Sequence, residues 1–220
     1  MAEVNFLTSK IKYGFTLAEV LITLVIVGVI AALTIPSVIN NTKKQEFVAG
    51  VKKAYSSLAQ ATNKIMTDEG LPRADIGGWA TSDDAVLDLY KKYLGAKDCP
   101  LSSCLSQYST TGPKGISGNS TSRDLWNTER GLLLADGMQL VVGHTNSQCN
   151  YGSNGGKCFE IFVDINGQKR PNQYGRDVFV FAVNENGFGI STTNDCDPSL
   201  SGSVGWACSA KVLRENAMNY

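Results

Sequence analysis

The chain has 220 residues and carries 20 basic and 20 acidic side chains, so its formal net charge at neutral pH is zero. This balance argues against strong generic binding to nucleic acid or to acidic membranes. Its single histidine, His144, has no neighbouring serine or free cysteine in the sequence to pair with, so we do not expect an enzyme with a triad or a cysteine nucleophile.

An apolar run extends from Phe15 to Ile35, behind a short leader. Its 21 residues, at about 1.5 Å each, match the roughly 30 Å hydrocarbon core of a bilayer, so the run can form a membrane helix. Lys10 and Lys12 precede the run, against Glu3 alone. Because basic flanks stay in the cytoplasm, the rest of the chain is expected on the other side of the membrane.

A carboxylate, that of Glu19, lies inside the apolar run. A carboxylate in hydrocarbon costs on the order of a few kcal/mol, so such a residue usually has a partner. A plain anchor helix would leave Glu19 unexplained. A secretory signal peptide would end in a small-x-small cleavage pattern, which Ala31 and Ala32 fit poorly.

The sequence GFTLAEVLITL, which begins at Gly14, resembles the cleavage and methylation motif of type IV prepilins and of the pseudopilins of type II secretion systems. Tyr13, between the basic residues and Gly14, is a modest departure from that pattern. The resemblance implies that a membrane peptidase cuts between Gly14 and Phe15 and methylates the new amino group of Phe15. It also implies that Glu19, fifth in the mature chain, pairs with a neighbouring subunit's amino group during filament growth. Such pairing offsets much of the cost of burying both charges.

Two residues that weaken helices, Gly28 and Pro36, follow in the same run. Glycine costs a helix about 1 kcal/mol and proline about 3 kcal/mol relative to alanine, so the helix is expected to bend or unwind most easily between them. This placement is similar to that in flexible pili, where the helix loosens. The alternative is that a membrane helix simply tolerates both residues.

Beyond this run, apolar residues recur every three or four positions until Gly70 and Pro72 end the pattern. We therefore expect one long helix from about Phe15 to about Glu69. A second helix is predicted over residues 83–94. The stretch 97–122 is rich in Ser, Thr and Gly and has neither period, so it is predicted to be a loop.

From Gly131 onward the pattern changes to strands. LLLA and MQLVV flank an Asp-Gly pair and predict a hairpin, and FEIFVDI alternates along one face. VFVFAV, residues 178–183, has no polar face and is expected to be a central strand, followed by a last strand near 188–191. These elements predict an α+β, pilin-like fold, in which the long helix packs on an antiparallel sheet of four or five strands.

The expected organisation has three parts. Residues 1–14 form a leader that is cleaved, and residues 15–36 form the membrane helix that becomes the filament core. Residues 37–220 form one extracytoplasmic head, which includes the second half of the long helix and is long enough to bury a sizeable core.

The six cysteines all lie in the predicted head, where an oxidising compartment makes disulfides expected. Six cysteines allow 15 connectivities, and their spacing in close pairs favours local bridges. Zinc is disfavoured because no two cysteines have the CxxC spacing. Major pilins commonly have a disulfide-closed loop near the carboxyl terminus, similar to the last pair. The expected pairs are Cys99 with Cys104, Cys149 with Cys158, and Cys196 with Cys208.

Carboxylate and amide oxygens concentrate between Asp164 and Asp177. Calcium could be bound by Asp164, Asn166 and Asp177, and the resembled major pseudopilins bind calcium in C-terminal loops, but their pattern is not reproduced here. A connection between two strands explains the same residues, so we expect no cofactor and no metal. The three tryptophans are expected to cover the core.

The sequence therefore predicts a structural subunit of a type IV pilus-like filament. Its expected partners are further copies of itself, a prepilin peptidase and an inner-membrane assembly platform. It is expected in the inner membrane through its N-terminal helix, with the head outside, and later in a pilus or a periplasmic pseudopilus. Two alternatives remain open: a pseudopilin of a type II secretion system, and a monomeric, membrane-anchored binding module.

Overall fold

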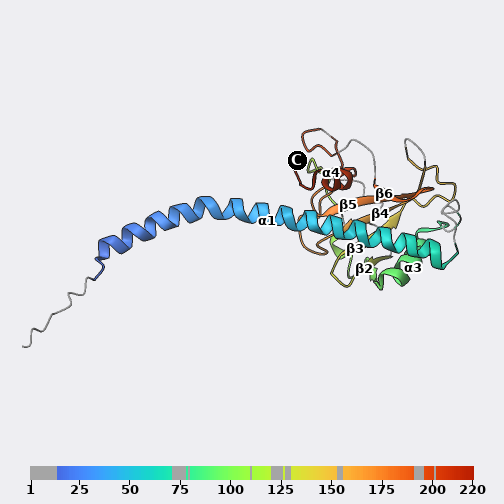
Figure 1. The fold of residues 1–220 in the computed structure, drawn as a ribbon, viewed down its shortest axis with the longest axis horizontal. Coiled ribbons are helices and arrows are strands. Elements are labelled where there is room, and N and C mark those ends of the chain that lie inside the picture. The colour runs from blue at the N-terminus through green and yellow to red at the C-terminus, as the bar shows by residue number, and fades with distance from the viewer. Residues whose placement is uncertain are drawn as a thin grey trace, which may run out of the picture. The chain divides into compact units, whose positions relative to one another are not determined.

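The computed structural model describes residues 14–70, 78, 80–109, 111–119, 126, 130–152, 156–190, 196–200 and 202–220. The chain divides into two compact units, residues 1–43 and residues 44–220. Helix α1 (Leu17–Asp68) begins in the first unit and ends in the second (Figure 1). The predicted long helix is therefore present, with its ends within two residues of those expected.

The apolar side chains in the first half of α1 are exposed. Phe15, just before the helix, is 91% exposed, and Ile39 is still 47% exposed. By length and composition, α1 qualifies as a helix that can cross a membrane. Since an apolar surface of this extent is unfavourable in water, this half of α1 requires a membrane or other subunits around it.

In the second unit, one face of α1 packs into the core. Its buried side chains recur at helical spacing, because positions three and four apart share a face. Tyr55 lies beside two rings of the sheet, with centroids 6.2 Å from Phe181 and 5.4 Å from Phe188. The buried residues of α1 are Val48, Val51, Ala54, Leu58, Ala61, Thr62 and Ile65.

Helix α3 (Asp83–Leu94) packs beside α1. Ser82 caps its start by accepting a hydrogen bond from the Ala85 N–H at 3.1 Å, and Gly95 ends it in the left-handed conformation. The Tyr90 and Thr62 hydroxyls, both fully buried, lie 2.5 Å apart. This buried polar contact fixes the position of α3 along α1.

The described residues form one antiparallel sheet of six strands, in which each strand pairs with the next in the chain. The predicted α+β class is confirmed, with more strands than the four or five expected. The extra strand, β1, lies in the stretch predicted to be a loop; its sequence KDCP has no apolar alternation that would reveal it. The strands are β1 (Lys97–Pro100), β2 (Arg130–Leu133), β3 (Gln139–Gly143), β4 (Lys157–Asp164), β5 (Val178–Asn184) and β6 (Gly187–Ile190).

Both faces of the sheet are buried. One face packs on α1 and α3, and includes Phe159 and Phe181. The other face carries a second core, formed by residues such as Phe162 and Val180 and covered by the chain around Tyr108. This second core explains why β5, the predicted central strand between β4 and β6, has no polar face.

The tryptophans cover the second core where the structure describes them. Trp126 is fully buried there and donates to the Tyr174 hydroxyl at 3.1 Å. Trp206 packs on the same cluster. The third, Trp79, lies outside the described residues. A short 3-10 helix, η2 (Ser106–Tyr108), follows β1 in the chain. Helix α4 (Cys208–Glu215) lies against β5 (Figure 1).

Candidate processing and assembly site

The start of α1 brings Thr16 and Glu19 together. The Thr16 N–H and the Thr16 hydroxyl each donate to Glu19 Oε2 at 2.8 Å, and the Glu19 N–H donates to Thr16 Oγ1 at 3.2 Å. This reciprocal arrangement is a capping box, which satisfies backbone donors that the first turn of a helix leaves without partners. Within a single chain, the Glu19 carboxylate therefore caps its own helix.

Thr16 is the residue that the sequence analysis missed at this site. Its signal was readable, because a threonine followed three residues later by a glutamate, just before an apolar run, is the pattern of a capping box. The motif indicates that Glu19, an acid in an apolar segment, pairs with a group of another chain. The structure adds a partner within the same chain.

The predicted cleavage bond, between Gly14 and Phe15, lies before the first residue of the helix. Apart from its chain neighbours, a side-chain carbon added at Gly14 would meet no described atom within 4 Å. Among the described residues, the bond thus lies outside the helix, beside open space at Gly14. The structure is compatible with the cleavage role of Gly14 and Phe15, which stays a prediction.

The threonine hydroxyls within the apolar run are satisfied by the helix itself. Thr23 donates to the Val20 carbonyl at 2.9 Å, and Thr34 donates to the Ile30 carbonyl at 2.9 Å. A hydroxyl that bonds its own backbone does not need water. The run can therefore enter an apolar medium without leaving these donors unpaired.

Helix α1 continues without interruption through Gly28 and Pro36. Proline lacks an N–H, so the ladder of the helix loses one hydrogen bond at Pro36. At Gly28, apart from its chain neighbours and the backbone of the helix itself, no described atom lies within 4 Å of the position that a side-chain carbon would take. Flexibility between these residues stays a prediction, in a segment where neighbouring side chains give the helix no support.

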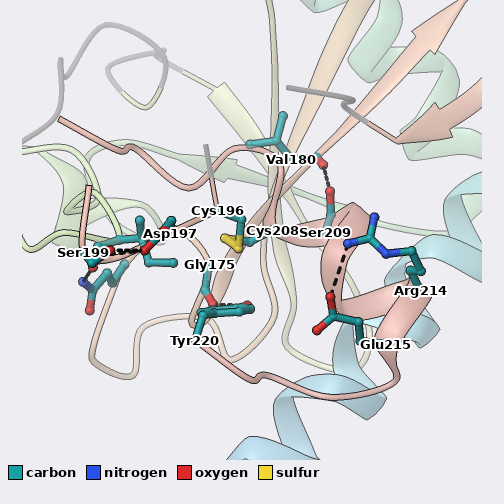
Figure 2. The surroundings of a disulfide bond; sticks show 12 residues. Gly175, Val180, Cys196, Asp197, Ser199, Cys208, Ser209, Arg214, Glu215 and Tyr220 are labelled. Carbon is teal, nitrogen blue, oxygen red and sulfur yellow. Dashed lines mark hydrogen bonds and ion pairs between the residues drawn. A yellow bond between two sulfur atoms is a disulfide. The ribbon is translucent and has the colours of Figure 1, made fainter. Parts of the chain in front are cut away.

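The three disulfides of the structure join the cysteines in the local pairs predicted from their spacing. Cys99–Cys104 closes the turn after β1, and Cys149–Cys158 joins the loop after β3 to β4. Cys196–Cys208 attaches the preceding loop to the first residue of α4 (Figure 2). Bridges that close such short loops contribute on the order of 2–3 kcal/mol each by limiting the unfolded chain.

The residues considered for calcium lie together in the loop between β4 and β5. Asp164 is buried and accepts hydrogen bonds from the Tyr108 hydroxyl at 2.6 Å and from the Asn166 N–H at 3.1 Å. Burial raises the pKa of Asp164 well above its usual 3.8, and the nearby charge of Asp177 raises it further.

Asp177 organises the rest of this loop. It accepts hydrogen bonds from the N–H groups of Asn172 and Gln173, at 2.8 and 2.7 Å, and from the Asn166 amide at 3.2 Å. Burial raises its pKa, although these donors lower it in part. Internal donors thus occupy both carboxylates, and the described residues include no cluster of three or more His, Cys, Asp or Glu side chains suited to a metal. The possibility of a calcium site at Asp164, Asn166 and Asp177, which the sequence analysis did not favour, stays untested.

These raised pKa values predict a pH dependence of stability. A carboxyl whose pKa is higher in the folded state binds more protons there than in the unfolded state, so stability falls as pH rises from about 3.8 through the folded pKa. We expect Asp164→Asn to make this decline shallower, because the variant has no proton to lose at this position. Urea unfolding of the full chain in detergent between pH 4 and 7 measures the slope.

Asp68→Asn is the matched control, because it removes an exposed carboxylate at the end of α1. Between pH 4 and 7, the free energy of unfolding of this variant should fall with the same slope as that of the unmodified chain. If the stability of Asp164→Asn fell with rising pH as steeply as that of Asp68→Asn, the raised pKa of Asp164 would be contradicted.

A buried charge cluster lies on the face of the sheet opposite α1. The Glu160 side chain is fully buried, with Lys157 Nζ at 2.6 Å and His144 Nδ1 at 2.9 Å. Burial alone would raise the pKa of Glu160, but hydrogen bonds from His144 and Lys157 outweigh it and leave the pKa lowered. His144 also stacks on Tyr151, with ring centroids 4.4 Å apart. His144, the only histidine of the chain, is thus a hydrogen-bond partner of the buried Glu160 carboxylate.

The N-terminal part of the chain matches the family model of the prokaryotic N-terminal methylation motif, over residues 9–35. The chain carries a prepilin-type methylation motif. The matched residues include Gly14, Phe15 and Glu19 and end within the first unit. A search of curated proteins and a search of solved structures each gave no match.

The prepilin-type motif and the α+β, pilin-like fold together resemble type IV pilins and pseudopilins. Proteins of this kind are typically structural rather than enzymatic. The motif implies processing by a peptidase and assembly into a filament in general terms. The apolar start of α1 indicates membrane anchoring with the head outside the cytoplasm.

Proposed function

We propose that this prepilin-like chain is a structural subunit of a type IV pilus-like filament, cut after Gly14 and assembled through α1. The observation that carries the proposal is the start of α1. There, the prepilin motif, the capped carboxylate of Glu19 and an exposed apolar helix surface occur in one segment.

The assembly step follows from the charges that processing creates. Cleavage frees an ammonium group at Phe15, and methylation preserves its positive charge. When the apolar surface of α1 packs against other subunits, this cation and the Glu19 carboxylate both leave water, and each then needs an opposite charge. A Glu19 on one subunit that meets the Phe15 ammonium of the next satisfies both groups and sets the axial position of the incoming subunit.

Hydrophobic burial supplies the driving force for this packing. Large apolar side chains from Phe15 to Ile39 are about half to nine-tenths exposed in the single chain. Burial of apolar surface contributes roughly 25 cal/mol for each Å² removed from water, but a subunit in the membrane already buries this surface among lipid tails. The charge pair therefore decides where subunits meet, while the apolar surface permits them to pack.

The partners and the location follow from the same segment. A prepilin peptidase removes residues 1–14, an inner-membrane assembly platform adds the subunit to the filament, and other copies surround α1. Residues 15–36 cross the inner membrane before assembly, and the head, residues 37–220, lies outside the cytoplasm.

A pilus is favoured over a secretion pseudopilus by the head. Three disulfides brace it, and one of them closes a loop that ends at α4, near the carboxyl terminus. A pseudopilin of a type II secretion system is the second candidate, supported by the same motif. A monomeric anchored module would use α1 for the membrane alone, and the Glu19 carboxylate would then serve only as a helix cap.

The mature N-terminus tests processing directly. We expect N-terminal sequencing and mass spectrometry of the chain from membranes to give methylated Phe15 as the first residue. Gly14→Val should retain residues 1–14, because the branched side chain occupies the cleavage position. A mature chain that starts at any other residue would refute the proposal at its first step.

A further inference from the structure

Residues 216–220, which we call the tail, turn back along the head after α4. Asn216 ends α4 in the left-handed conformation, with φ of 54°, and its N–H donates to the Val212 carbonyl at 2.9 Å. This conformation is tolerated by asparagine and glycine and disfavoured for branched residues. The backbone at Asn216 therefore sets the direction in which the tail leaves the helix.

Two side chains of the tail attach it to the head. Met218 is 5% exposed and belongs to the core between the sheet and α1. The Tyr220 hydroxyl donates to the Gly175 carbonyl at 2.6 Å, beside the Cys196–Cys208 disulfide (Figure 2). Lys211 Nζ of α4 lies 5.6 Å from the centre of the Tyr220 ring. The tail is thus fixed at both its middle and its end.

The tail also contacts α1. Lys44 Nζ donates to the Met218 carbonyl at 3.2 Å, between residues 174 positions apart in the chain. Lys44 is the first residue of the second unit. The first side chains of α1 that pack into the core of the head come later, with partly buried Phe47 and buried Val48. Among the described residues, the contact of Lys44 with the tail therefore lies nearly one turn before the first side chains of α1 that enter the core.

We propose that the tail is a strap that sets the point at which α1 becomes free of the head. With the strap in place, the head holds α1 from Lys44 onward. With the strap released, the helix is held only from Phe47 and Val48, so about one more turn, roughly 5–6 Å of helix, joins the unsupported segment that contains Pro36. This inference concerns the head itself and does not depend on the proposed function.

Hydrogen–deuterium exchange of the full chain in detergent micelles tests the strap. Carbonyls of residues 44–47 accept from the N–H groups of residues 48–51 in the helix, so opening of this turn exposes those four amides. Lys44→Met removes the donor but keeps the aliphatic stem. We expect these amides to exchange about twofold to tenfold faster in this variant, the range for loss of one surface hydrogen bond.

Lys43→Met is the matched control, because it makes the same change of charge one residue earlier, at a side chain with no contact to the tail among the interactions of the described residues. It should leave the four amides at the original rate. Equal rates in Lys44→Met and Lys43→Met would overturn the proposal.

A second pair of variants acts from the tail. Asn216→Val should misdirect residues 217–220 and accelerate the same four amides, whereas Asn216→Gly should preserve the left-handed turn and the original rates. The amides of β4 and β5 report the rest of the head. If Asn216→Val accelerates them as much as residues 48–51, the tail contributes to general stability and does not act as a strap.

Discussion

Glu19→Ala is expected to abolish filaments while the peptidase still removes the leader. Cleavage depends on the bond between Gly14 and Phe15, which lies outside the helix, and this substitution does not change it. Assembly would bury the Phe15 ammonium without a counter-charge, and an uncompensated buried charge costs about 3–5 kcal/mol. This corresponds to a loss of at least a hundredfold in assembly, measurable by electron microscopy of cell surfaces and by quantification of sheared filaments.

Glu19→Gln separates the two roles of this side chain. Glutamine can still accept from Thr16 and complete a capping box, but it has no charge. We expect Glu19→Gln to lose filaments as Glu19→Ala does, because the missing property is the charge. Glu46→Gln, which removes an exposed acid further along α1, should assemble normally. Normal filaments from Glu19→Gln would show that Glu19 acts as a cap and that charge pairing is unnecessary.

Gly175→Ala is expected to cause a large loss of stability in the head. Gly175 has a φ of +75°, and a side-chain carbon there would lie 2.7 Å from the Cys208 sulfur and 2.9 Å from Ile116 Cδ1. The left-handed conformation costs a non-glycine residue about 1–2 kcal/mol, and overpacking adds about 1–3 kcal/mol. The free energy of unfolding should fall by roughly 2–5 kcal/mol in urea titrations of the full chain in detergent.

Gly118→Ala separates the conformational cost from the steric cost. Gly118 has a similar φ of +85°, but, apart from its chain neighbours, an added carbon would meet no described atom within 4 Å. Its loss of stability should therefore stay near 1–2 kcal/mol, the backbone part alone. Equal losses at the two glycines would mean that the contact with Cys208 and Ile116 relaxes without cost.

Several parts of the fold follow from short sequence patterns. The 3.6-residue period and its end at Gly70 predicted α1, and the hairpin of β2 and β3 followed from its Asp-Gly turn. The disulfide pairs followed from cysteines five to twelve positions apart. In each case the interacting residues are near one another in the chain, so their spacing carries the information.

Other parts of the structure have no such signal. β1 is a strand only because Lys97–Pro100 pairs with Arg130–Leu133, thirty or more positions later in the chain. The second core, which covers the outer face of the sheet, brings residues around Tyr108 onto strands β3 to β5. The contact of His144 with the buried Glu160 depends on the register of β3 and β4, which places the two residues near each other.

The sequence by itself determined the methylation motif, the position of Glu19 in an apolar helix, and the α+β class of the head. These are properties of neighbouring residues, governed by helical and strand periods and by local turns. Only the tertiary structure decided that both faces of the sheet are buried, that Asp164 and Asp177 share one loop, and that the tail reaches Lys44. Such contacts depend on how all elements pack together, because residues far apart in the chain become neighbours only when the whole core forms.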